Sequence, residues 1–416
     1  MGTGFTMWFP VGKGRPKDRR VYEDYFKGVG SVVPGWEPWT YFGEDGFRIR
    51  LAPIEEDIYC IWEDRMLQVS ARTNSAGPGY HAYLIDVMDG LGIAPADVED
   101  ETGYYEHRDF GKLQGEMANW LQNLSEKVIE MSAEGGYADL TISMTTDQIP
   151  TDTGRFTSCP LGHFERGFFE RAQKDTSAAA EFFVWWNRER DAAFFRNVAL
   201  HLIHCEVNWL PPETDAEREA VAATLACLEK AYSMDPGLDY PAPEWEELAL
   251  LSGGTWSEAA HPGLMERSRQ RRGGSQEKLG YARGSLSQSV GCWRFVRDGM
   301  MHYDMEENGV SVWWDDDVTI RASTISVQQR DDIVDKSRSL LQSATRGEEG
   351  WEPLTLRDPE IPACIMHKTV EEDGEPLLMT RMAAALEGEL LLLDVYYVDG
   401  GRRGQAAKVC ESVTSS

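Results

Sequence analysis

The order of strand-type and helix-type segments limits the folds open to this chain. Four short runs rich in aromatic and β-branched residues come first, separated by turn-forming residues: Trp39–Phe42, Phe47–Leu51, Ile58–Trp62 and Met66–Ala71. They predict an antiparallel meander. After Gly77-Pro78-Gly79 the apolar spacing becomes helical over Tyr80–Leu91 and Phe110–Met131, and Tyr137–Met144 returns to strand character. This order predicts an α+β domain over residues 1–150 and argues against a doubly wound sheet.

The middle of the chain has the composition of a helical region that packs on the first domain. Within residues 151–251, dense apolar and aromatic residues predict helices at Phe164–Ala172, Ala178–Ile203, Ala216–Tyr232 and Pro243–Leu250. Residues 252–285 are instead rich in Gly, Ser, Gln and Arg, and they have no apolar period. Such a segment cannot support a core, so we expect a flexible basic linker.

Strand patterns return in residues 286–416. Strands are expected at Trp293–Val296, Met301–Met305, Val310–Trp314, Val318–Val327, Ala363–Val370, Pro376–Glu387 and Leu390–Val398. One helix is expected at Asp331–Ser343, between the fourth and fifth of these strands, and another from Gln405 to about Val413.

The C-terminal element order resembles that of the Mog1/PsbP-like family. The resemblance lies in Gly309–Val327 as hairpin and long strand, Asp331–Ser343 as helix and Gly374–Val398 as hairpin. It implies an α/β sandwich with an antiparallel sheet, in a family whose members act mostly by binding proteins. It implies no individual functional residue, because the resemblance lies in the order of elements and the spacing of apolar residues and not in a sequence motif.

Negative charge is spread along the whole chain. The formal net charge is −29, from 41 Lys+Arg and 70 Asp+Glu, and it divides as −12 over residues 1–150, −6 over 151–285 and −11 over 286–416. Such a field repels phosphate backbones, so we expect no nucleic-acid partner. It would steer a basic protein toward the surface. Basic residues cluster only at Lys13–Arg20 and within Arg267–Arg283.

Cysteine usage and hydropathy predict a cytoplasmic protein. The seven cysteines are odd in number, widely spaced and never in a CxxC pair, which favours reduced thiols. The first residues do not have the charge order of a secretory signal. No run reaches the roughly 18 apolar residues that cross a bilayer, so no membrane association is expected.

Two histidine-containing segments of the first domain are the candidate catalytic groups. In the first, Gly77-Pro78-Gly79 precedes a helix that carries His81 and Asp86, and its backbone N–H groups could meet an anion. In the second, His107 and Asp109 offer acid/base groups. The alternatives are a rigid turn and a loop in which Asp109 caps the next helix.

Metal and thiol chemistry have weaker candidates. His201 and His204 lie three residues apart and could share a helix face, and Glu206 or Cys205 could complete a zinc site. They lack the HExxH order, however, and have apolar flanks. Cys159 and His163 could form a thiolate pair. Asp315-Asp316-Asp317 fits no EF-hand pattern and is typical of a solvated strand end. We therefore expect neither a metal nor a cofactor.

These observations leave two functions open. The favoured one is a non-catalytic protein-binding protein, such as an immunity protein that neutralises a basic toxin or a chaperone of secreted effectors. The alternative is a hydrolase with a site in the N-terminal 250 residues near His81 and His107. The arginines of the linker, Arg267, Arg269, Arg271 and Arg272, could bind an acidic or anionic partner, or could dock on the protein's own domains.

Overall fold

The computed structural model divides the chain into two compact units. Unit 1 comprises residues 1–144, 153–207 and 215–281, and unit 2 comprises 145–152, 208–214 and 282–416. The structure describes residues 3–11, 16–54, 57–63, 65–133, 142, 147–151, 156–271, 279–326, 339, 341–343, 345, 349–372 and 374–415. Expected boundaries near 150 and 285 lie close to changes of unit, whereas the one at 251 falls inside unit 1. The two short segments that join unit 2 were not anticipated.

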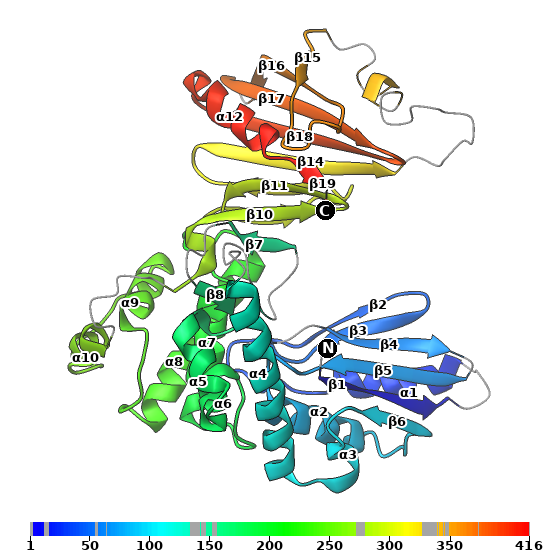
Figure 1. The fold of residues 1–416 in the computed structure, drawn as a ribbon, viewed down its shortest axis with the longest axis vertical. Coiled ribbons are helices and arrows are strands. Elements are labelled where there is room, and N and C mark those ends of the chain that lie inside the picture. Colours follow the sequence, from blue (N-terminus) through cyan, green and yellow to red (C-terminus); the bar gives the residue numbers. More distant parts are fainter. Residues whose placement is uncertain are drawn as a thin grey trace. The chain divides into compact units, whose positions relative to one another are not determined.

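Unit 1 is built on a six-stranded antiparallel sheet in the order β2-β3-β4-β5-β1-β6 (Figure 1). Its strands are β1 (Gly4–Pro10), β2 (Trp39–Phe42), β3 (Gly46–Arg50), β4 (Ile58–Glu63), β5 (Met66–Arg72) and β6 (Asp97–Asp100). The meander from β2 to β5 confirms the prediction. Strand β1 was not anticipated, although Phe5, Met7 and Phe9 alternate with period two and are buried. It lies between β5 and β6.

Four helices accompany this sheet. They are α1 (Pro16–Lys27), α2 (Pro78–Gly90), α3 (Tyr104–His107) and α4 (Phe110–Ala133). Helix α1 buries Phe26 against Phe47 of β3, with the ring centroids 5.9 Å apart. Helices α2 and α4 confirm the helical spacing, and α1 was not foreseen. The strand expected at Tyr137–Met144 lies outside the described residues except for Ile142.

The remainder of unit 1 is largely helical. It contains a hairpin of β8 (Phe156–Cys159) and β9 (Gly162–Glu165), and the helices α5 (Arg166–Ala172), α6 (Ala179–Phe182), α7 (Ala192–Cys205), α8 (Asp215–Met234), α9 (Ala242–Leu251) and α10 (Leu264–Arg271). The expectation of one continuous helix over Ala178–Ile203 is wrong. The chain leaves α6 in an extended conformation at Phe183, and Asp191 begins α7 by accepting a hydrogen bond from the Phe194 N–H (2.8 Å).

The expected flexible linker contains more structure than its composition suggested. Helix α10 lies in it, and Leu264, His261 and Ser268 are buried. The Ser268 hydroxyl donates to the Tyr240 carbonyl (3.0 Å), which ties the helix to the segment before α9. Isolated apolar residues can therefore anchor a short helix even without a period. Residues 272–278 lie outside the described residues.

Unit 2 contains two antiparallel sheets. The smaller has the order β19-β11-β10-β7 and the larger the order β12-β13-β14-β18-β17-β16-β15. The smaller comprises β7 (Gln148–Pro150), β10 (Ser285–Val290), β11 (Trp293–Asp298) and β19 (Thr414–Ser415). The larger comprises β12 (His302–Met305), β13 (Ser311–Trp314), β14 (Val318–Ser326), β15 (Glu352–Leu354), β16 (Ala363–Glu372), β17 (Glu375–Leu386) and β18 (Glu389–Tyr397).

One face of the larger sheet forms the core of unit 2. Ile320, Met382 and Val395 from that face pack in one cluster with Trp293 and with Cys410 of helix α12 (Arg403–Glu411). The seven expected strands and the terminal helix are confirmed. Of the helix expected at Asp331–Ser343, the structure describes only 339 and 341–343, which are helical.

The fold is therefore α+β, with an antiparallel sheet and helices first, a helical middle and antiparallel sheets at the end. Every strand pairing among the described residues is antiparallel. Consecutive strands such as those from β2 to β5 are joined by short turns, as the turn residues predicted, whereas β1 with β5 and β14 with β18 pair strands that are distant in the sequence. Among the described helices, none is both long and apolar enough to cross a bilayer.

Candidate functional site

His81 lies in a buried hydrogen-bond network in unit 1. Its side chain is fully buried, and its Nδ1 lies 2.9 Å from the Thr73 hydroxyl. On the other side of the ring, Nε2 lies 3.3 Å from both the Thr102 hydroxyl and an Asp100 carboxylate oxygen. The network joins the end of β5, the start of α2 and the end of β6. Its position among elements of one core indicates a structural role.

Asp100 is the charged member of this network. Burial alone would raise its pKa, but the interaction with His81 and hydrogen bonds from the Tyr105 N–H (2.7 Å) and from Thr102 hold the pKa well below its usual range. The carboxylate is therefore ionised although its side chain is only 3% exposed. It stabilises the turn that leads from β6 into α3.

The other proposed catalytic groups do not meet His81. Asp86 is exposed and pairs with Arg188 (3.1 Å). His107 is also exposed, and its Nδ1 accepts a hydrogen bond from the Asp109 N–H (2.9 Å). Asp109 in turn accepts from the Lys112 N–H (3.2 Å), so it caps α4 as the alternative predicted. Among the described residues, His81, Asp86, His107 and Asp109 thus take part in separate hydrogen bonds and ion pairs, and these contacts lend the hydrolase hypothesis no support.

The glycine turn before α2 does not offer free donors to an anion. The Gly79 N–H donates to the Trp185 carbonyl (2.9 Å), and the Trp185 N–H donates to the Ala76 carbonyl (2.8 Å). A Cβ atom on Gly79 would come within 2.0 Å of the Trp185 ring. The turn is therefore a rigid packing site for the segment that follows α6, and the anion-binding interpretation is not supported.

The histidines of α7 lie in the interior of unit 1. His201 Nδ1 is 3.0 Å from the Pro160 carbonyl, and the His204 ring packs edge-on against His163 at 4.7 Å. Burial lowers the pKa of His201 and, more strongly, that of His204, while burial raises the pKa of the Cys159 thiol well above its usual value. A protonated thiol is no nucleophile. The described residues contain no cluster suited to a metal.

The arginine segment is partly docked on its own unit. The guanidinium of Arg267 donates to the carbonyls of Pro262 (3.0 Å) and Pro236 (3.3 Å), which favours the intramolecular alternative. Arg269 is exposed. Arg272 and the side chain of Arg271 lie outside the described residues.

A groove lies on the face of the larger sheet of unit 2 that is turned away from the core, with a volume of about 410 Å³. Strand register explains its floor. Thr319, Tyr396, Met379 and Lys368 are paired in a row across β14, β18, β17 and β16. Because neighbouring residues of a strand face opposite sides, the flanking Ile320 and Val395 point into the core.

Carboxylates line this groove. Asp315, Asp316 and Asp317 form the turn from β13 to β14, and Glu371 lies near the other end, on β16. The cations beside them are Arg321, which pairs with Glu306 (2.6 Å), and Lys368. Asp317 pairs with Arg402 (2.9 Å). Among the described residues, Asp315, Asp316 and Glu371 have no ion-pair partner.

The turn itself is fixed by Asp315. Its carboxylate accepts hydrogen bonds from the N–H groups of Asp317 (2.7 Å) and Val318 (2.8 Å), which holds Asp316 outward at the tip of the turn. The prediction of a solvated strand end is thus confirmed. What the sequence did not reveal is that Glu371, more than fifty positions away, borders the same groove. It lies at the end of β16, where this strand turns toward β17.

An exposed apolar side chain adjoins the carboxylates. Val398 is 65% exposed, and its N–H donates to the carbonyl of Asp317. Behind it, Arg381 and Asp394 form a two-point ion pair on the same face of the sheet (2.7 and 2.8 Å). The groove therefore combines unpaired negative charge with apolar surface on a rigid sheet. It can bind a basic, partly apolar segment.

Comparison with known proteins adds no function. No family model matches the chain, and no curated protein matches it. Among solved structures, it is similar to one from Bacteroides thetaiotaomicron VPI-5482, with 8% identity and a TM-score of 0.26. The alignment covers 30% of this chain and 45% of that one, so the chain spans less than half of the match. The Mog1/PsbP-like resemblance stays a prediction.

Proposed function

We propose that this protein is a non-catalytic, cytoplasmic binding protein that captures a basic protein partner. An immunity protein that neutralises a basic toxin, or a chaperone of secreted effectors, would have this chemistry. The observation that carries the proposal is the groove of unit 2, whose unpaired carboxylates Asp315, Asp316 and Glu371 border exposed apolar surface.

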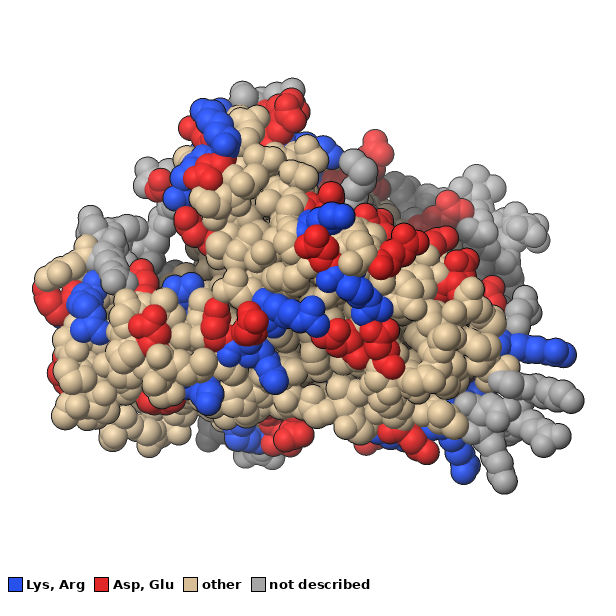
Figure 2. Space-filling view, turned by 90° about the horizontal axis from the view of Figure 1, so that it is seen from below, with Lys and Arg blue, Asp and Glu red and all other residues tan. Residues whose placement is uncertain are grey.

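The charge distribution supports capture by steering. Figure 2 shows acidic and basic side chains interspersed on the visible face, with neutral areas between them, and not a single acidic patch. A net charge of −29 raises the encounter rate with a basic protein, while the groove supplies the local contacts. The Mog1/PsbP-like resemblance of residues 286–416 points to the same class of function.

Titration calorimetry with a lysine-rich peptide tests this proposal, with a glutamate-rich peptide of equal length as the charge control. We expect the lysine-rich peptide to bind and the glutamate-rich peptide not to bind. The affinity should fall steeply as the salt concentration rises from about 50 to about 300 mM, because salt screens the charges. The double variant Asp316→Asn, Glu371→Gln should lower affinity at low salt about three- to tenfold.

A matched variant separates the groove from the general charge. Glu116→Gln with Glu126→Gln removes two exposed carboxylates from α4 in unit 1. We expect it to affect binding much less than the groove variant. Equal losses from both pairs would show that the groove is not the site. Absence of binding, or affinity that does not change with salt, would refute capture by steering.

A further inference from the structure

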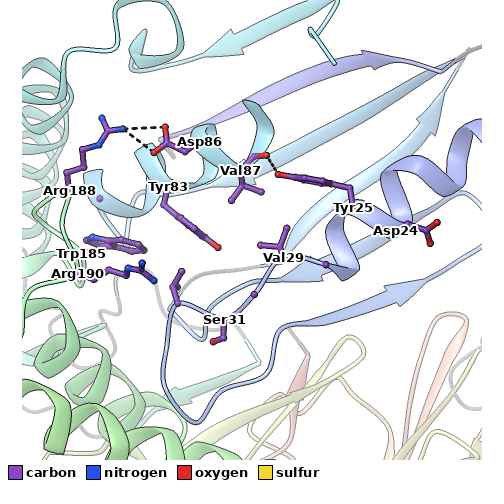
Figure 3. Close-up of a pocket in the computed structure, with 14 residues that line it drawn as sticks. Asp24, Tyr25, Val29, Ser31, Tyr83, Asp86, Val87, Trp185, Arg188 and Arg190 are labelled. Carbon is purple, nitrogen blue, oxygen red and sulfur yellow. Dashed lines mark hydrogen bonds and ion pairs between the residues drawn. The ribbon is translucent and has the colours of Figure 1, made fainter. Parts of the chain in front are cut away.

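A second cavity, in unit 1, is unrelated to the groove of unit 2. Its volume is about 730 Å³, within the range of small-molecule sites. It lies between the end of α1 with the loop after it, the outer side of α2, and the segment that joins α6 to α7 (Figure 3). Elements distant in sequence thus enclose one space.

Tyr83 of α2 supplies an unsatisfied polar group to this cavity. Figure 3 shows its side chain extending from α2 into the space between Trp185 and Val29. Its hydroxyl is buried and has no hydrogen-bond partner among the described residues. Burial raises the pKa of Tyr83 to about 12, although Arg190 lowers it in part. The phenol is therefore protonated at neutral pH and can donate, and a buried donor without a partner is costly.

Arg190 supplies an available positive charge beside it. Its side chain is exposed and makes no ion pair or hydrogen bond with the described residues. Figure 3 shows it beneath Trp185, directed toward the same space as Tyr83. Its neighbour Arg188 is, in contrast, neutralised by Asp86 (3.1 Å) and held by the Tyr104 hydroxyl (2.8 Å). In a chain of net charge −29, a guanidinium at a cavity wall that pairs with no described carboxylate indicates a site for an anion.

The walls of the cavity are held in place. The Tyr83 and Trp185 rings stack with centroids 5.5 Å apart and an interplanar angle of 28°. Backbone hydrogen bonds fix Trp185 to the start of α2, and the Tyr25 hydroxyl donates to the Val87 carbonyl (2.6 Å), which fixes α1 to the end of α2. The Tyr83 side chain and the aromatic wall are thus positioned before any ligand binds.

We infer that this cavity binds a small aromatic oxyanion, with the oxyanion on the Arg190 guanidinium and the Tyr83 hydroxyl and the ring packed between Tyr83 and Val29. A guanidinium fork and a phenol donor complement the oxygens of a carboxylate or a phosphate. The volume accommodates a molecule as large as a mononucleotide. The site is separate from the groove of unit 2, and this inference does not rest on the proposed function.

Calorimetric titration of the full chain with two probes tests the inference. Adenosine 5′-monophosphate carries a ring and a phosphate, and indole-3-acetate carries a ring and a carboxylate. We expect at least one to bind, and the identity of that probe decides between the two oxyanions. Adenosine lacks the phosphate, and ribose 5-phosphate lacks the aromatic ring. If the site prefers a phosphate, each of them should bind at least about tenfold more weakly than adenosine 5′-monophosphate. Failure of both aromatic anions to bind would overturn the inference.

Variants test the assigned atoms. Arg190→Gln should weaken binding about tenfold or more, and Tyr83→Phe, which removes only the unpaired hydroxyl, about three- to tenfold. Arg171→Gln removes an exposed arginine of unit 1 that pairs with Glu181. Neither residue lines the cavity, so this variant should leave binding unchanged. Unchanged affinity in Arg190→Gln would refute the site. The melting temperature of Tyr83→Phe provides a check of folding. If it equals that of the natural protein, weaker binding by this variant is due to the missing hydroxyl and not to unfolding.

Discussion

Asp100 illustrates how a single buried charge fixes local structure. The carboxylate accepts hydrogen bonds from the backbone of Thr102 and Tyr105 and interacts with His81, so it organises the chain between β6 and α3. A segment rich in His, Glu and Asp, which suggested acid/base catalysis, is instead arranged around this one buried acid. The residue that matters most there was not among the candidates from the sequence.

Asp100→Asn should reveal this role through its pH dependence. Because the folded-state pKa lies below the unfolded value, Asp100 stabilises the fold above pH about 4, and the contribution is lost as pH falls further. We expect the variant to lose about 1–3 kcal/mol of unfolding free energy at pH 7. The difference from the natural protein should narrow between pH 4 and 2, as measured by urea unfolding.

Asp89→Asn is the matched control for that experiment. Asp89 is about half exposed and pairs with Arg108 at the surface. Surface pairs contribute little, so we expect a change below about 1 kcal/mol at neutral pH. A loss in Asp100→Asn that stays constant over the whole pH range would contradict the ionised, stabilising carboxylate.

At the level of elements, the apolar stretch of residues 178–203 is divided into the two helices α6 and α7. The contact between α2 and the segment 183–191 determines where this break falls. The aromatic density of residues 178–203 has helical spacing, but Trp185 exchanges backbone hydrogen bonds with Ala76 and Gly79 and cannot also remain in a helix. A long-range contact thus outweighs local spacing. No single-sequence pattern marks that choice, because the partner lies more than a hundred residues earlier.

Gly79→Ala should disturb this junction. A methyl group at Gly79 would collide with the Trp185 ring and the Asn187 carbonyl, both held by the fold. We expect a loss of about 1–3 kcal/mol of unfolding free energy, as for other overpacked sites. Gly115→Ala on α4 is the control: a Cβ there meets no atom within 4 Å, so a gain of about 0.5–1 kcal/mol is expected. Equal melting temperatures for both variants would contradict the close packing.

Elements with a strong local signal were predictable, and those defined by distant partners were not. The strands β2 to β5 and β16 to β18 follow from alternation and turn residues, and α2, α4 and α8 follow from helical spacing. Strands β7 and β19 are short and form only because β10 and β11 offer edges to pair with. The same holds for the groove of unit 2. Its Asp315-Asp316-Asp317 turn was visible in the sequence, whereas the row of Thr319, Tyr396, Met379 and Lys368 that forms its floor depends on strand register.

For the molecule as a whole, the division into units does not follow the chain. Unit 2 draws residues 145–152 and 208–214 from within the sequence of unit 1. Strand β7 pairs with β10, and Glu213 contacts both Trp314 (3.0 Å) and His302. The C-terminal 130 residues, which the sequence suggested as an independent sandwich, therefore lack part of their unit when taken alone.

The isolated fragment 282–416 should show this dependence. Without β7, the edge of β10 is unpaired, and exposed strand edges promote association. We expect the fragment to self-associate in sedimentation experiments, and we expect addition of a peptide spanning 145–152 to reduce this. A fragment that remains monomeric without the peptide would show that β7 is dispensable.

The pairing of β7 with β10 also affects the order in which the chain can fold during synthesis. Gln148 leaves the ribosome about 140 residues before its partner Gln288, a delay of roughly 7–28 s at ordinary elongation rates. During that interval the segment after α4 has no strand to join, although the residues on both sides of it belong to unit 1. The residues of unit 1 that follow this segment are therefore synthesised before the partner of β7 is available. Unit 2 can therefore be completed only after the residues that follow unit 1 in the chain have emerged.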